Sequence, residues 1–130
     1  MIETGIKGSI KKTVTSEMTA KIIGSGELDV LATPALIALA EEAAWKSVAD
    51  ELETDQGTVG TNMNLSHIAA TPVGMTVRCE TELTSIDRRK LTFCIEAYDE
   101  KEKIATGTHE RFIIDNKTFR EKAYGKLNHD

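Results

Sequence analysis

Residues 33–52 read TPALIALAEEAAWKSVADEL, and the rest of the chain can be arranged around them. Thr33 is a good N-cap, and Pro34 suits the first helical position, where its missing N–H costs no hydrogen bond. Nine of the thirteen residues from Pro34 to Lys46 are apolar. A helix that is apolar on nearly every side is surrounded by protein, so we predict a long buried central helix.

After this helix, apolar residues recur at every second position. In MTVRCETELTSI (75–86) and KLTFCIEAY (90–98), apolar and polar side chains alternate, which is typical of strands with one buried and one wetter face. The links IDRRK and DEKEK supply the turns. KIATGTHERFIID (103–115) alternates more weakly, and TVGTNMNLSHI (58–68) predicts a further strand that must end by Thr71-Pro72.

An upstream segment, SIKKTVT (9–15), is rich in β-forming residues and is expected to join the same sheet. The order is then strand, helix and four strands, joined mainly by short connections that demand antiparallel neighbours. One helix cannot cover both faces of such a sheet, so we expect a curved sheet to wrap around it. This α+β arrangement, with an antiparallel sheet of five or six strands around one long buried helix, is the hotdog fold.

The composition limits the classes of protein to which this chain can belong. The 130 residues, 40% hydrophobic and 28% charged, fit a single globular domain over residues 1–130. A net charge of −5 argues against a nucleic-acid partner. No apolar run approaches the roughly 18 residues of a membrane span, and no signal peptide is visible, so we expect a soluble cytoplasmic protein without a membrane partner. Cys79 and Cys94 alone predict neither a disulfide framework nor a zinc site.

Three stretches carry a resemblance that covers roughly the whole chain: LATPALIALAEEA (31–43), VGTNMNLSHIAATPVG (59–74) and ATGTHERFII (105–114). The middle one is the most specific, because His-x-Ala-Ala-Thr-Pro-x-Gly is long and lies at the right distance from the helix. In these stretches the chain resembles the hotdog thioesterases related to fluoroacetyl-CoA thioesterase. The resemblance implies hydrolysis of an acyl-CoA thioester without a metal or other cofactor.

The same resemblance implies a set of site residues. The family's threonine falls on Thr33, its glutamate eight residues later on Glu41, and its histidine on His67. Gly60 matches a glycine whose backbone helps to place the acyl group. Arg111 matches an arginine close to that pocket.

These residue types also have chemical reasons of their own. A thioester carbonyl needs a nucleophile, a base and donors for the developing oxyanion. Thr33 begins the helix, where free N–H groups favour an anion, although it could serve only as an N-cap. His67 is followed by small residues and suits a general base near pH 7, although a lone histidine is often structural. His129, in the C-terminal tail, is set aside.

Two adjacent glutamates, Glu41 and Glu42, point in different directions on a helix. Desolvation of either carboxylate would raise its pKa toward values useful for acid–base chemistry. We expect Glu42 to pair with Lys46 at i,i+4 and Glu41 to point inward. His109 and Arg111 share one strand face, either as a cross-strand charge cluster or facing the acyl pocket.

Two further segments bear on the substrate. Residues 88–90, Arg-Arg-Lys, are either a solvated turn or a site for the CoA phosphates. The segment AKIIGSGELDVLA (20–32) contains none of the phenylalanines with which the fluoroacetyl-specialised member gates its pocket, so the resemblance does not name the acyl group. Gly24 and Gly26 suggest a mobile lid.

We therefore expect an acyl-CoA thioesterase for a short or medium acyl group. The alternative is a non-catalytic protein that binds acyl-CoA or another small ligand, and a hotdog dehydratase would need a different acid–base set. Exposed edge strands predict a homodimer with the sites at or near the subunit boundary.

Overall fold

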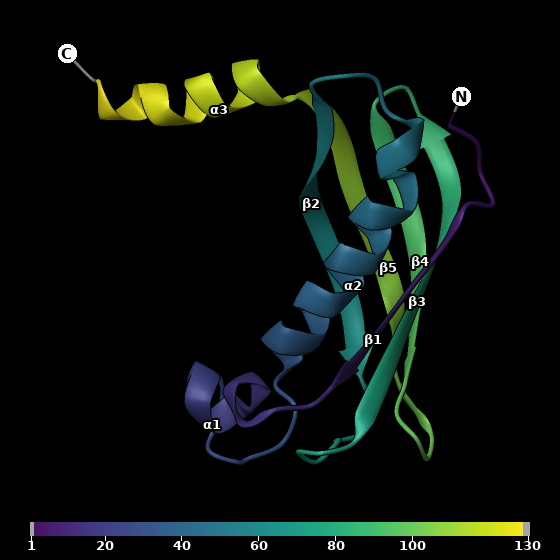
Figure 1. The fold of residues 1–130 in the computed structure, drawn as a ribbon, viewed down its shortest axis with the longest axis vertical. Coiled ribbons are helices and arrows are strands. Elements are labelled where there is room, and N and C mark those ends of the chain that lie inside the picture. The colour runs from purple at the N-terminus through teal and green to yellow at the C-terminus, as the bar shows by residue number, and fades with distance from the viewer. Residues whose placement is uncertain (1, 129–130) are drawn as a thin grey trace.

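The computed structural model describes residues 2–128. Five antiparallel strands form one sheet in the order β1-β3-β4-β5-β2, and α2 packs against one of its faces (Figure 1). The strands are β1 (Lys7–Thr13), β2 (Gln56–His67), β3 (Thr76–Asp87), β4 (Lys90–Tyr98) and β5 (Lys103–Asp115). The helices are α1 (Ala20–Ile23), α2 (Thr33–Val48) and α3 (Asn116–Tyr124), with short 3₁₀ turns at Ser16–Met18, Ala49–Glu51 and Gly125–Leu127. The predicted hotdog arrangement is confirmed, with five strands in the part of the chain described.

The alternation predicted for β3 and β4 determines which face is buried. Side chains at every second position face α2 and are fully or almost fully buried, namely Val77, Cys79, Thr81, Leu83, Leu91, Phe93, Ile95 and Ala97. Cys94 has the opposite parity from Cys79 and is only partly buried, and both thiols are free. This parity places the core between the sheet and α2.

α2 is covered on one side only. Six of its residues are buried: Leu36, Leu39, Ala40, Ala43, Ala44 and Val48. Pro34, Ala38 and Trp45 are exposed on the other side, and Trp45 is 42% accessible. The prediction of a helix surrounded by protein is therefore wrong for one chain, because α2 has more apolar residues than one sheet face can cover.

α3 was not predicted from the sequence. Asp115 caps it by accepting the Thr118 N–H at 3.0 Å, yet none of its residues is buried, so no core pattern marks it. The helix projects away from the sheet (Figure 1). His129, set aside on sequence grounds, lies outside the described residues. Within residues 2–128, no helix combines the length and apolar character needed to cross a membrane.

Candidate active site

Thr33 and His67 meet where the start of α2 approaches the end of β2. The Oγ1 atom of Thr33 lies 2.8 Å from Nδ1 of His67. Ala32 is the N-cap of α2, and no side chain caps this end, so the predicted capping role of Thr33 is wrong. Its hydroxyl bonds to an imidazole instead. This pairing is what activation of a hydroxyl nucleophile requires.

The environment of His67 favours a neutral imidazole. Burial lowers the pKa of His67, and the backbone of Ala69 opposes that shift only in part. Within the described residues, the buried Nε2 atom has no hydrogen-bond partner. In the tautomer that carries its hydrogen on Nε2, Nδ1 accepts from the Thr33 hydroxyl, and His67 can act as a base.

The pair opens onto a pocket of about 350 Å³ between the segment before α2 and the segment after β2. These segments are tied together, because the N–H of Leu31 donates to the carbonyl of Thr71 at 2.9 Å, and Val30 forms a β-bridge with Pro72. The pocket is lined by Ala20, Ser25, Val30, Leu31, Ala32, Thr33, His67, Ile68, Ala69 and Ala70. No lining residue carries a fixed charge, which suits an uncharged part of a ligand.

Glu41 belongs to a second group of residues, formed with β2 and β5. Its Oε2 accepts from Nη1 of Arg111 at 3.4 Å, and its side chain is 40% exposed. Nε of Arg111 donates to Oγ1 of Thr58 at 2.8 Å, and Nη2 donates to the carbonyl of Thr58 at 3.0 Å. Burial lowers the pKa of Arg111, but the Glu41 carboxylate opposes the shift. Arg111 is thus bound to Thr58 of β2 through Nε and Nη2, and its Nη1 contacts the Glu41 carboxylate.

His109 completes this second group, and both of its ring nitrogens have partners. Its Nδ1 lies 2.7 Å from the carbonyl of Asn62 and therefore donates, which leaves Nε2 to accept from Arg111 at 3.1 Å. Burial, with the charge of Arg111, lowers the pKa of His109. The 3.8 Å approach of Nε2 to Glu41 is therefore no charged pair. His109 is a neutral, buried support for Arg111.

Gly60 makes room for Glu41. It lies at a bulge in β2, and a Cβ atom there would collide with Oε2 of Glu41 and stand 3.2 Å from Nη1 of Arg111. Glu42, by contrast, pairs with Lys46 at 2.6 Å, as predicted. Another pocket, of about 370 Å³, opens beside Glu41 and Arg111 and reaches the exposed Trp45.

One chain does not bring all the predicted site residues together. Thr33 pairs with His67, whereas Glu41 groups with Gly60 and Arg111. Eight residues separate Thr33 from Glu41 on one helix, which is about 12 Å along its axis. Within one chain the two groups are therefore separate.

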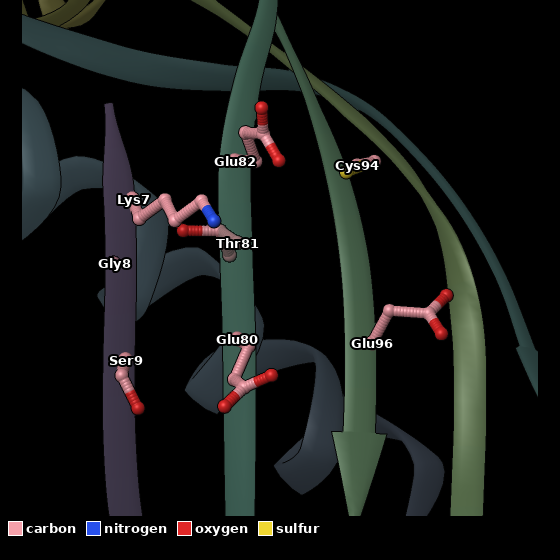
Figure 2. Close-up of a pocket in the computed structure, with 8 residues that line it drawn as sticks. All are labelled: Lys7, Gly8, Ser9, Glu80, Thr81, Glu82, Cys94 and Glu96. Atoms are coloured by element: carbon pink, nitrogen blue, oxygen red, sulfur yellow. The ribbon is translucent and has the colours of Figure 1, made fainter. Parts of the chain in front are cut away.

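Other hollows are less suited to acyl transfer. A hollow of about 410 Å³ on the outer face of the sheet is bordered by Glu80, Glu82, Glu96 and Cys94 (Figure 2), without a base held against a hydroxyl. The turn at residues 88–90 borders a smaller pocket beside Phe112, but Arg88 faces Asp87 at 3.4 Å, and Lys90 lies 3.8 Å from Glu110. Neither hollow shares a lining residue with the Thr33–His67 pocket.

Comparison with known proteins identifies the family of this chain. The family described as fluoroacetyl-CoA-specific thioesterase, FlK, matches residues 14–117. A fluoroacetyl-CoA thioesterase of Streptantibioticus cattleyicolor is 38% identical over 98 residues, which are 75% of this chain and 70% of that protein. The chain belongs to the fluoroacetyl-CoA-specific thioesterase family.

Solved structures of this thioesterase family and its relatives agree with that assignment. A mutant of the thioesterase FlK in complex with fluoroacetate and CoA superposes with a TM-score of 0.86 at 31% identity, over 91% of this chain and 99% of that one. A thioesterase superfamily member from Thermus thermophilus gives 0.89 at 25% identity, over 98% and 94% of the two chains. The chain is therefore homologous to a thioester hydrolase and has the hotdog thioesterase fold.

Sequence reasoning missed the residues that support Arg111 in this thioesterase-family chain. Thr58 and Asn62 are ordinary polar residues of a strand in the sequence, and only the β2–β5 register reveals that they bond to Arg111 and His109. In the sequence, the signal of this network was that His109 and Arg111 lie two residues apart and so share one strand face. Both are buried, at 1% and 6% accessibility, which favours a fixed internal network over a solvated charge cluster.

Proposed function

We propose that this chain hydrolyses acyl-CoA thioesters through Thr33 and His67, without a metal. The hydrogen bond of 2.8 Å between Thr33 Oγ1 and His67 Nδ1 beside an uncharged pocket is the observation that supports this most strongly. A protein that only bound acyl-CoA would need the pocket but not a hydroxyl held against a half-buried imidazole.

The reaction we propose has two steps. Nδ1 of His67 takes the hydroxyl proton while Oγ1 of Thr33 attacks the thioester carbonyl carbon, and the carbon–sulfur bond then breaks. The CoA sulfur leaves with the proton returned by His67, and the acyl group remains on Thr33 as an ester. A water molecule, deprotonated by His67, then releases the carboxylic acid and restores the threonine.

The first turn of α2 is suited to stabilise the oxyanion. Pro34 has no N–H, and the N–H of Ala32 already donates to the carbonyl of Met18 at 2.9 Å. The N–H groups of Thr33 and Ala35 lie in the first turn, where a helix offers them no acceptor of its own. In the proposed reaction they donate to the oxyanion formed beside Thr33, and the positive end of the helix dipole adds to the effect.

We also propose that the working protein is a homodimer whose sites combine the two groups described above. α2 leaves Pro34, Ala38 and Trp45 uncovered, and β2 is a free edge of the sheet. Two α2 helices that pack antiparallel across a two-fold axis near Ile37 would place Thr33 of one chain beside the partner subunit's Glu41. Such a contact would also cover the apolar side of α2.

The buried Nε2 of His67 supports this arrangement. This Nε2 has no hydrogen-bond partner within the described residues, and a carboxylate is the acceptor that would best stabilise the imidazolium formed during the reaction. Glu41 has one Oε2 contact to Arg111 and remains 40% exposed on the open side of α2, so it can serve a second chain. Arg111 and Gly60 hold its position.

The test is hydrolysis of a panel of acyl-CoA thioesters by the parent and two alanine variants. Thr33→Ala and His67→Ala should each lower turnover by about 10²- to 10⁴-fold, while acyl-CoA binding changes little, because both groups act mainly in the transition state. Thr33→Ser, which keeps the hydroxyl, should retain part of the parental activity. Thr84→Ala, an exposed threonine of β3 whose hydroxyl donates only to the Thr92 carbonyl, is the matched control. A folded His67→Ala protein with parental turnover would contradict the proposal and favour the binding protein.

A further inference from the structure

α3 is anchored at its first residue and is exposed along its whole length. The N–H of Asn116 donates to the carbonyl of Asp55 at 2.9 Å, and a Cβ atom on Gly57 would collide with the Asn116 side chain. The helix therefore has a fixed direction, which carries it past β2, the free edge of the sheet (Figure 1). A helix of nine residues is marginal in water by itself, so α3 needs a contact that its own chain does not supply.

The side chains of α3 indicate what kind of surface it would contact. Phe119 is 45% exposed, Tyr124 is 55% exposed, and Leu127, in the 3₁₀ turn that follows, is 72% exposed. Three cations and one anion give the helix a net charge of +2, whereas the whole chain carries −5. These charged residues are Lys117, Arg120, Lys122 and Glu121. A surface that is both apolar and acidic would complement this helix.

Such a surface lies at the other end of the chain, on residues 20–31 and 68–73. The hydrogen bond between Leu31 and Thr71 joins these two segments, and Glu27 and Asp29 are exposed on the first of them. Exposed aliphatic side chains lie on both segments, namely Ile22, Ile23, Leu28, Ile68 and Val73. We call these residues, with Glu27 and Asp29, the pocket-end surface. α1 and α3 lie at opposite ends of the molecule, so a chain cannot cover this surface with its own α3 (Figure 1).

We infer that α3 of each chain packs on the pocket-end surface of its partner. The inference rests on the proposed homodimer, in which two α2 helices pack antiparallel about an axis near Ile37. Trp45, eight residues after Ile37, then lies level with residue 29 of the other chain, eight residues before it. Asn116 borders one hollow with Trp45, so α3 begins at the level of the partner's pocket-end surface.

The two-fold axis makes this contact twice, with the same complementarity each time. Phe119 and Leu127 cover aliphatic side chains of the partner, and the cations of α3 face the carboxylates of its residues 27 and 29. Ile68 belongs both to the pocket-end surface and to the lining of the Thr33–His67 pocket. α3 of one chain therefore adds a wall to the site of the other.

Photo-crosslinking of the full chain tests where α3 lies. Benzoylphenylalanine replaces Phe119, isotope-labelled and unlabelled chains are refolded together, and mass spectrometry identifies the crosslinked peptides after irradiation. We expect links from position 119 to residues 20–31 or 68–73 of the other chain. Links within one chain, or links to the outer face of the sheet of another dimer, would overturn the inference.

The dissociation constant of the dimer, measured by analytical ultracentrifugation, gives a second readout. Phe119→Ser should raise this Kd by about 100-fold, because the lost apolar contact occurs twice. Asp29→Lys should raise it by about tenfold, and less at high salt. Glu3→Lys makes the same change of charge at an exposed residue before β1, the edge strand opposite β2, and should leave the Kd unchanged. A Phe119→Ser dimer as tight as the parent would overturn the contact.

The outcomes separate this inference from the proposed function. A parent that is monomeric removes the homodimer and the α3 contact together. A dimer whose crosslinks lie elsewhere keeps the homodimer and overturns only the α3 contact. If the expected crosslinks form but no acyl-CoA is hydrolysed, the α3 contact stands and the proposed hydrolase fails.

Discussion

His109 is buried and His67 is half-buried, and the two histidines differ in what their ring nitrogens can do. Both nitrogens of His109 are occupied, one by the Asn62 carbonyl and the other by Arg111. His67 has one nitrogen on the Thr33 hydroxyl and one without a partner in the described chain. The sequence motif pointed to His67, but the hydrogen-bond partners of the two imidazole rings depend on contacts between residues far apart in the sequence. For that reason the neutral role of His109 could not be predicted.

The pH dependence of hydrolysis tests His67 as the base. Burial lowers the pKa of His67, so the neutral, active imidazole persists to lower pH than in an ordinary histidine. We expect kcat/KM to fall as pH drops through the pKa of His67, and this limb to move to lower pH in Glu41→Gln, which removes the carboxylate that would stabilise the imidazolium. Hydrolysis rates measured across pH 4.5–8, with folding checked by circular dichroism at each pH, test this prediction. Activity that does not fall on acidification, while the protein stays folded, would contradict the assignment.

At the scale of elements, the alternation of apolar and polar residues predicted the strands whose burial depends on their own sequence. The alternation in 75–86 and 90–98 placed β3 and β4 because each strand carries its own buried face and ends in a turn. The open side of α2 was missed, since apolar composition does not say how many faces one sheet can cover. α3 was missed because it contributes nothing to the core, although Asp115 was a visible capping residue.

The crossing of α2 over β1 gives a stability prediction. A Cβ atom on Gly8 would collide with the backbone carbonyl of Ala43 and stand 2.8 Å from Cβ of Ser47. Because backbone cannot swing aside as a flexible side chain can, Gly8→Ala should lower the free energy of unfolding by about 1–3 kcal/mol. Gly125→Ala is the matched control, since nothing lies within 4 Å and its φ of −59° is helical. Urea unfolding curves that show equal midpoints for both variants would refute this packing.

At the scale of the whole molecule, we propose that the chain is half of a dimer. The apolar side of α2, the free edge of β2 and the separation of Glu41 from Thr33 all have one explanation in a two-fold dimer. The family resemblance named the candidate site residues, but it could not show that one chain holds them in two places. Light scattering of the parent at micromolar concentration should give the mass of a dimer, and a monomer mass would remove this explanation.

Complementation between two inactive variants tests the shared site most directly. Thr33→Ala and Glu41→Gln should each be at least about 100-fold less active than the parent, whereas Glu42→Gln, next to Glu41 but paired with Lys46, should keep parental turnover. When the two inactive variants are unfolded and refolded together, half of the dimers are mixed, and each mixed dimer holds one intact site. Acyl-CoA hydrolysis should then recover to about a quarter of the parental rate. A mixture of dimers no more active than its two components would show that Thr33 and Glu41 do not work across the subunit boundary.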